Sequence, residues 1–210
     1  MFLIDALLQG ILMGLLFALV ALGLTVIFGV MDIVNFAHGE FLMLGMYTIY
    51  WINKLFGIDP LLALPASTLL GALLGVASYY WFIKYLLRGP AIAQLFGTFG
   101  LMLFLQYTAM FLFSADYRMI DKGLLVGKSL SVGPFVFDWT KLASGILSLI
   151  AFAIVYYFIN KTKTGKAIQA TALNKEAASY MGIKTERMNA IAWAIGGATV
   201  GTAGGLLVNF

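Results

Sequence analysis

The sequence predicts an all-α fold, a polytopic bundle of about six membrane-spanning helices. Of its 210 residues, 62% are hydrophobic and 10% are charged, and a soluble fold of this size could not bury so much apolar surface in one core. The apolar residues also form continuous runs that are long enough to cross a bilayer as helices, and they do not alternate as the strands of a membrane barrel would.

Composition also excludes several classes of protein. The chain has no cysteine, so we expect neither disulfides nor a thiolate metal site, and no residues suggest another metal site or a cofactor. The net charge of +4 reflects basic residues between apolar runs, which is typical of membrane topology rather than of nucleic-acid binding. The N-terminal "MFLIDALLQG" has no basic region of the kind that opens a cleavable signal.

The distribution of basic residues predicts the orientation of the spans, because short cytoplasmic loops are rich in Lys and Arg. The connections 84–94 and 160–188 are basic, whereas the basic residues of 116–141 are nearly balanced by acids. We therefore expect the first two in the cytoplasm, and 116–141, 53–60 and the N-terminus outside. The expected spans are 6–30, 39–55, 61–83, 95–115, 142–159 and 189–208.

The connection 116–141 contains several glycines and a proline, followed by Trp139 near the next span. This composition predicts an ordered extracytoplasmic loop with an aromatic residue at the membrane interface. Within it, "GLLVGKS" (123–129) is close to a phosphate-binding loop, but it has three residues between its glycines where that motif requires four. We therefore expect no ATPase activity in this chain.

Several spans carry small residues four positions apart, which places them on one face of a helix. The first interpretation is close helix packing; the alternative is a substrate passage, since glycine also lets a helix bend or approach a ligand. The sets are Gly10 with Gly14, Gly71 with Gly75, and Gly197 with Gly201 and Gly205.

The segment 160–188 contains two expected helical stretches. Residues 166–173 favour helix, and one expected face comprises Ala170, Leu173, Ala177 and Tyr180. The sequence "NKEAASYMG" that follows has the signals of a short capped helix.

In that short helix, Asn174 is expected to accept from the first free amides, and Glu176 would lie in the first turn, where the helix dipole favours an acid. Gly182 can adopt the left-handed conformation that ends a helix, and Thr185 is expected to cap the last span. Such a segment is either a solvated amphipathic surface or a helix presented to a cytoplasmic partner.

The stretch "VNFAHGEFL" (34–42) puts titratable groups between two apolar runs. Glycines here would let the helix break, and a broken helix in a membrane needs partners for its backbone. One interpretation is that polar side chains stabilise this break, with a buried imidazole. The alternative is that they line the translocation route or its cytoplasmic gate, because ionisable groups inside a membrane often mark pathways. The residues concerned are Asp32, Asn35, His38, Gly39 and Glu40.

Two stretches resemble a known family. "EAASYMG" (176–182) resembles the EAA-x-x-x-G loop of ABC-transporter permeases, and "GLTVIFGVMDIVNFAHGEFLMLGMY" (23–47) is similar to the "NFAHGE" segment of branched-chain amino-acid permeases. Both occur in the order typical of that family, and the resemblance covers most of the chain. Residues 1–210 would then form one permease domain, with 160–188 as its coupling loop.

The resemblance implies a multi-pass subunit of a prokaryotic cytoplasmic (inner) membrane that is not itself an enzyme. Its expected partners are a second, homologous permease, two ATP-binding subunits and an extracytoplasmic solute-binding protein that delivers leucine, isoleucine or valine. Family permeases continue into further C-terminal spans, so the end at Phe210 predicts a truncated chain. The residues that the resemblance assigns to ATPase coupling are Asn174, Glu176, Ala177, Ala178 and Gly182.

Two alternatives stay open. The cargo could be urea, a short amide or another amino acid. A different class, a self-sufficient secondary transporter or channel, would use His38 and Glu40 as a proton relay and would require paired broken helices in an internal repeat. An intramembrane enzyme is disfavoured, because one histidine and no cysteine leave few combinations of nucleophile and base.

Overall fold

The predicted all-α bundle is confirmed by a computed structural model, which describes residues 2–114, 116, 118–120, 123, 128–132 and 135–208. Its long helices are α1 (Phe2–Met31), α2 (His38–Phe56), α3 (Leu64–Ser78), α5 (Ala91–Phe113), α6 (Trp139–Lys161) and α9 (Thr185–Leu207). The shorter elements are the π-helical turn η1 (Tyr79–Ile83), α4 (Lys84–Leu86), α7 (Lys163–Leu173), α8 (Lys175–Tyr180) and the strands β1 (Ser129–Val132) and β2 (Phe135–Asp138).

Within the described residues, 5 helical segments are long and apolar enough to cross a membrane. The expected second span, now α2, does not meet this criterion, although it has 19 residues. It carries Glu40 and Lys54 as well as His38, and charged residues are costly in lipid. α2 packs against α3 and α9, so part of its surface is covered by protein. The 5 segments that meet the criterion are Ala6–Met31, Leu64–Leu86, Ala91–Phe113, Trp139–Lys161 and Thr185–Leu207.

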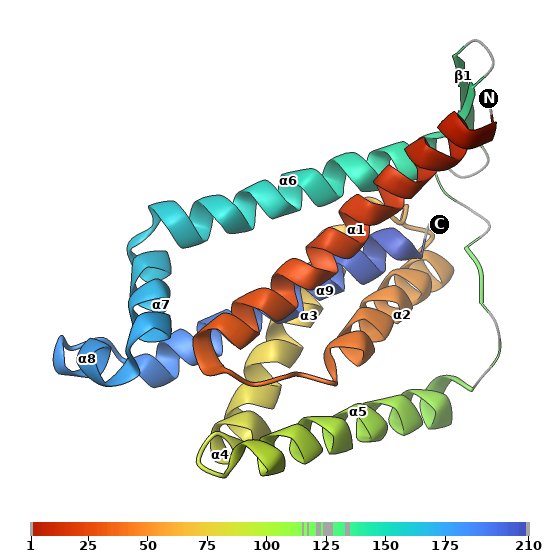
Figure 1. Ribbon diagram of the computed structural model, residues 1–210. Helices are drawn as coiled ribbons and strands as arrows, with labels where there is room; N and C mark the ends of the chain where they lie inside the picture. Colours follow the sequence, from red (N-terminus) through yellow and green to blue (C-terminus); the bar gives the residue numbers. More distant parts are fainter. Residues whose placement is uncertain are drawn as a thin grey trace.

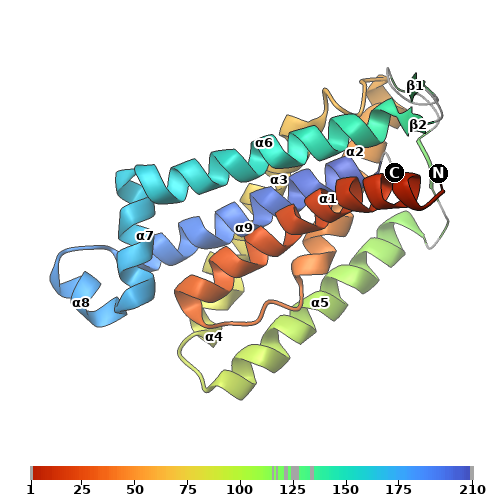
Figure 2. The ribbon, with the colours of Figure 1, turned by 45° about the horizontal axis from the view of Figure 1, so that its top comes forward.

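Successive long helices run in opposite directions (Figures 1 and 2), as six consecutive crossings would require. One end of the bundle, called here the α8 end, gathers α4, α7 and α8. The opposite end, called the hairpin end, holds the start of α1, the end of α9 and the strands. The two most basic connections of the sequence therefore lie at the same end.

α9 lies at the centre of the bundle and is its most buried span, with 67% of its apolar window inside the protein. It packs against α1, α2 and α3. These contacts are close because both sides lack side chains. A Cβ on Gly201 would come within 2.5 Å of the Ser67 carbonyl oxygen, and one on Gly45 within 2.7 Å of the Gly201 carbonyl oxygen. A Cβ on Gly205 would likewise come within 2.6 Å of the hydroxyl oxygen of Ser67.

Polar contacts add to this packing. The indole Nε1 of Trp193, which is fully buried, donates to Ser78 Oγ at 2.9 Å, and the hydroxyls of Thr68 and Thr202 lie 2.7 Å apart. In a membrane, interhelical hydrogen bonds and close packing replace the hydrophobic drive that is absent between apolar helices. α3 and α9 are thus held along most of their shared length.

The pair Gly10 and Gly14 on α1, unlike the glycines of α9, does not pack against another helix within the described residues. No atom of another element lies within 4 Å of a Cβ built on Gly10 or Gly14, so the described part of the chain does not pack against this face of α1. Leu7 and Ile11 beside them are exposed. The shared spacing of the glycines therefore does not predict which set packs inside the chain.

The connection 116–141 was expected to be a loop, but part of it is a β-hairpin. Ser129 pairs with Asp138 and Val132 with Phe135 in antiparallel register. Alternating Leu130, Val132, Phe135 and Phe137 explain the strands, since apolar and β-branched residues favour them. α6 follows directly at Trp139, which is exposed. Much of the rejected phosphate-loop pattern lies outside the described residues.

Candidate functional site

The "NFAHGE" stretch coincides with a break between α1 and α2. α1 ends at Met31 and α2 begins at His38, and Asp32 has a left-handed backbone with φ 51°. Asp tolerates this conformation better than most residues. The Asp32 amide still donates to the Phe28 carbonyl at 2.8 Å, so the last turn of α1 keeps its helical hydrogen bond up to the break.

His38 connects the two helices across this break. Its side chain is 5% exposed, and its Nε2 lies 3.0 Å from the carbonyl oxygen of Val20 on α1. A Cβ on Gly23 would lie 3.1 Å from His38 Cε1, so the glycine makes room for the ring. Nδ1 has no hydrogen-bond partner among the described residues, which leaves one polar atom of a buried imidazole unused.

Asn35 organises the break itself. Its Oδ1 accepts from the Ala37 amide at 3.1 Å, a local turn in which the side chain replaces a backbone partner. Asn35 is buried, but its Nδ2 lacks a partner within the described part of the chain. Together with His38, it leaves two unpaired buried polar atoms at the break, and such atoms are unusual enough to require an explanation.

Thr98 of α5 also contacts the break, and sequence reasoning missed it. Its fully buried hydroxyl donates to the Val34 carbonyl at 2.9 Å, so α5 is fastened to the connection. Phe36 and Phe99 add an edge-to-face ring contact at 6.2 Å. The sequence offered one signal for this contact: Thr98 is a polar residue inside the apolar run "QLFGTFGLM".

The remaining residues of this set lie farther out. Asp32 and Gly39 are exposed, and Glu40 is partly exposed. Of these five residues, only Asn35 and His38 are therefore buried, while the two acids lie toward the surface. The expected group of four polar partners is divided in this way between an inner pair and an outer pair.

The second predicted site is the α7–α8 segment at the α8 end, and the predicted caps of α8 are confirmed. Asn174 Oδ1 accepts from the Ala177 amide at 2.9 Å, and Glu176 lies in the first turn. At the other end Gly182 has φ 80°, and the Ile183 amide donates to the Ala178 carbonyl at 3.0 Å, a hydrogen bond typical of a glycine-terminated helix.

Two details of this segment differ from the prediction. Thr185 does not cap α9; it is the first helical residue, and Lys184 precedes it without a side-chain hydrogen bond. Residues 170–180 do not share one face, because the extended backbone of Asn174 separates α7 from α8. The buried side of α7 holds Gly165, Ile168 and Thr171. The side chain of Thr162, which sequence reasoning missed, caps α7 at the Gly165 amide.

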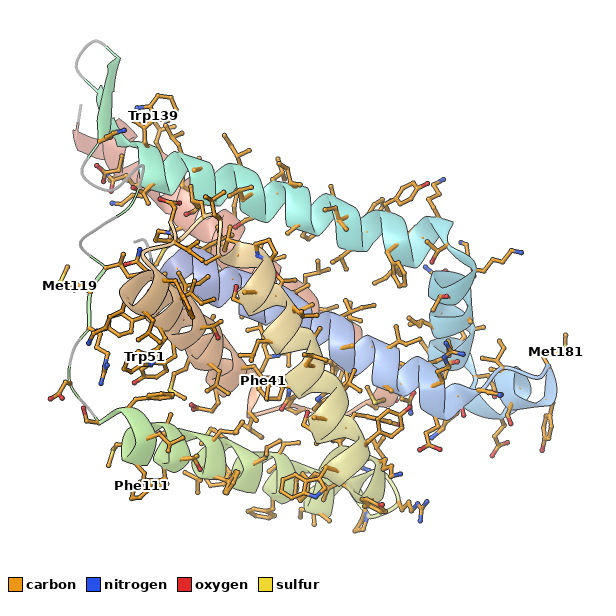
Figure 3. The ribbon with its side chains drawn as sticks, turned by 180° about the vertical axis from the view of Figure 1, so that it is seen from behind. Phe41, Trp51, Phe111, Met119, Trp139 and Met181 are labelled. Carbon is orange, nitrogen blue, oxygen red and sulfur yellow. The ribbon has the colours of Figure 1, made fainter. Side chains whose placement is uncertain are left out.

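α8 and the residues that flank it carry large apolar side chains with little protein around them: Tyr180 is the last residue of α8, Leu173 ends α7 and Met181 follows α8. Leu173 is 88% exposed, Tyr180 86% and Met181 83%, and Figure 3 shows Met181 at the outermost tip of the segment. Ala178 is buried and anchors the helix, whereas Glu176 and Ala177 are exposed. Apolar side chains that project from a basic polar segment are typical of a protein interface.

A cavity of about 580 Å³ lies where this segment joins α9, between Tyr80, Ser179 and Arg187. Lys84 and Glu186 form an ion pair beside it at 3.8 Å. The base of α8 is thus connected both to the start of α9 and to the end of the α3 span.

The apolar helices, the buried helix break and the projecting capped segment indicate a multi-pass membrane transport component. The chain belongs to the family described as branched-chain amino acid transport system / permease component, whose model matches residues 6–210. Membership implies ATP-binding and solute-binding partners in general.

Named relatives agree with this family. The chain is 28% identical over 222 residues to the high-affinity branched-chain amino acid transport system permease protein LivH of Salmonella typhimurium, covering 100% of this chain and 72% of the relative. It is 32% identical over 203 residues to a probable branched-chain amino acid transport permease protein LivH of Methanocaldococcus jannaschii, covering 91% and 62%. The permease protein BraD of Pseudomonas aeruginosa is 26% identical, with 97% and 70% covered. No solved structure gives a significant match.

Proposed function

We propose that this chain is the permease subunit of an ATP-binding-cassette importer that carries branched-chain amino acids across the inner membrane of a prokaryote. ATP hydrolysis takes place on separate subunits, two of them for a pair of permeases, and an extracytoplasmic binding protein delivers the substrate. Family membership and the names of the relatives support the substrate class. The observation that carries the mechanism is the capped, projecting α8.

In this proposal α8 is the coupling helix. Tyr180 of α8, with Leu173 at the end of α7 and Met181 just after α8, supplies the apolar contact with an ATP-binding subunit, because exposed apolar side chains on and beside a helix can enter a groove. Glu176 and Ala177 lie on the accessible surface beside them, and Ala178 fixes the helix to the bundle. The caps at Asn174 and Gly182 keep α8 rigid, so a displacement is transmitted rather than absorbed.

From α8 the displacement is transmitted to α9, because residues 181–184 connect the two helices directly. α9 contacts α1, α2 and α3 through Gly197, Gly201 and Gly205 or their neighbours. It also lies against the break that contains His38, since a Cβ on Gly23 would meet both His38 and Thr199. We infer that the 32–40 segment, with Asp32, Asn35, His38, Gly39 and Glu40, forms the gate that this movement opens.

Co-purification tests the coupling role. The transporter is expressed with its ATP-binding subunits, and their recovery with tagged permease is compared for wild type, Glu176→Lys and Gly182→Val. Valine at φ 80° would distort the end of α8, and a reversed charge would disturb the docked face. Recovery should fall about tenfold or more, as at an interface hot spot.

Gly100→Val is the matched control, because this glycine is exposed on α5 and a Cβ there meets nothing within 4 Å. Membrane-inserted protein should be equal in all variants. Undiminished recovery with both α8 variants would contradict the coupling role. Uptake of labelled leucine against labelled urea by the assembled wild-type transporter tests the substrate class.

A further inference from the structure

A second recess lies at the hairpin end of the bundle, far from α8, and the gate does not include it. It has a volume of about 330 Å³ and is lined by Met43, Met46, Tyr47 and Tyr50 of α2 together with Asp116 and Arg118. This size is at the lower end of the roughly 300–1,000 Å³ found for small-molecule sites. We call it the Arg118 recess.

Arg118 is held in place by aromatic rings. Its guanidinium lies 5.3 Å from the ring centroid of Tyr50 and 5.3 Å from that of Trp51, and its Nη2 donates to the Phe113 carbonyl. Figure 3 shows Trp51 on the side of α2 that faces α5 and the segment with Met119. Stacking, the backbone contact and a side-chain hydrogen bond with Tyr50 position the cation, while its Nε has no hydrogen-bond partner among the described residues.

Asp116 supplies the opposite charge. Its Oδ2 accepts from the Ser114 hydroxyl, and the side chain is exposed. The ion pairs within the described residues join Lys84 to Glu186 and Lys141 to Asp138. Asp116 and Arg118 take part in neither of them, so within the described residues the recess presents a positive and a negative group that do not form an ion pair.

The remaining wall is apolar and adaptable. Met43 and Met46 lie one turn apart on α2, and Tyr47 stacks on Phe113 with 4.5 Å between ring centroids. Methionine fits its shape to varied aliphatic groups because its side chain is unbranched and polarisable. The Arg118 guanidinium, the Asp116 carboxylate and the methionine wall correspond to the three parts of an aliphatic α-amino acid, and Lys54, which stacks on the same Tyr50 and Trp51 rings, adds positive charge beside the guanidinium.

We propose that the Arg118 recess binds the zwitterion of a branched aliphatic amino acid as the first contact of the substrate with the permease. The carboxylate is received by Arg118, the ammonium by Asp116, and the side chain by Met43 and Met46. This inference rests on the proposed function and adds a selection step within the permease itself. A neutral cargo such as urea would need neither charge.

Direct binding tests the recess. The complete transporter in lipid nanodiscs, without its solute-binding protein, is titrated with tritiated leucine by scintillation proximity. Wild type should bind, and Arg118→Gln should weaken the binding about tenfold, as expected when a hydrogen bond to a charged group is lost. Asp116→Asn should weaken it as well. Arg88→Gln is the matched control, because Arg88 also stacks on a tyrosine, Tyr85, at 5.8 Å, but at the α8 end.

Competition on wild type needs no variant and therefore does not depend on folding. 3-Methylbutylamine lacks the carboxylate and 4-methylpentanoate lacks the ammonium, so each should compete about tenfold less well than leucine. The inference would be overturned if either compound or urea competed as well as leucine. It would also be overturned if Arg118→Gln bound leucine as well as wild type does, or if wild type did not bind leucine. Leucine uptake by the whole transporter would then still support the proposed function, whereas absence of uptake in wild type would overturn that function.

Discussion

Gly71 on α3 and Gly197 on α9 face each other without a side chain between them: a Cβ on either residue would collide with the carbonyl oxygen of the other. Backbone atoms cannot move aside as the end of a flexible side chain can. The contact between these two helices therefore depends on glycine at both positions.

Gly197→Ala should lower the free energy of unfolding by about 1–3 kcal/mol, the usual cost of overpacking. Thermal unfolding of purified protein in detergent measures this effect. Gly29→Ala is the control, since its Cβ would meet no atom within 4 Å and alanine favours helix. Equal unfolding midpoints for the two variants would show that the helices separate easily at this point.

Asn174→Ala should weaken the coupling of transport to ATP hydrolysis. It removes the side-chain acceptor for the Ala177 amide, a loss of about 1 kcal/mol, from a helix of 6 residues. Stimulation of ATPase activity by the loaded binding protein should fall, while Asn174→Asp, which retains a cap, should keep it. Full stimulation in the alanine variant would mean that α8 does not depend on this cap.

His38 can be tested for its two possible roles with two substitutions. His38→Ala removes the contact with the Val20 carbonyl and should impair uptake more than it impairs recovery of the ATP-binding subunits. His38→Gln retains a side-chain donor that can reach toward that carbonyl. If glutamine restores uptake, His38 acts by holding α1 to α2; if uptake stays low in a stably folded variant, the imidazole is required in the gate itself. Normal uptake with alanine would exclude both roles.

The orientation of the bundle can be tested with single cysteines, because the natural chain has none. Lys163→Cys at the α8 end should react with a membrane-impermeant maleimide only after the cytoplasmic face is exposed. Leu62→Cys, at a residue that is 69% exposed near the opposite end, should react in intact cells. The reverse pattern would invert the orientation and place α8 where no ATP-binding subunit could reach it.

Much of the fold could be predicted because its signals are local. Apolar runs predicted the six long helices, and Asn174 and Gly182 predicted the caps of α8 from backbone chemistry alone. The break before His38 was predicted from polar residues between two apolar runs, but the glycines expected to allow it do not form it: Gly29 lies within α1 and Gly39 within α2, and the left-handed residue is Asp32. In each case the deciding residues are close together in the sequence.

Features that depend on distant partners could not be predicted in this way. Gly10 with Gly14 and Gly197 with Gly201 have the same spacing, yet only the second pair packs within the described chain. The contact of Thr98 with the Val34 carbonyl and the stacking of Arg118 on α2 join segments that are far apart in sequence. Thr185 had the chemistry of a cap, but the backbone begins the helix at that residue itself.

The unbroken course of α9 has a mechanical consequence. With 23 residues, this helix is about 35 Å long at the usual rise per residue. Its first turn follows the connection from α8, and Val208, immediately after its last turn, lines the Arg118 recess. Because hydrogen bonds and glycine contacts hold α9 against α3 along most of their shared length, we expect α9 to move as one rigid unit rather than to bend. If ATP-binding subunits dock on α8 as proposed, a displacement there would reach the Arg118 recess as a change of its shape, and ATP binding would be linked directly to the release of the cargo.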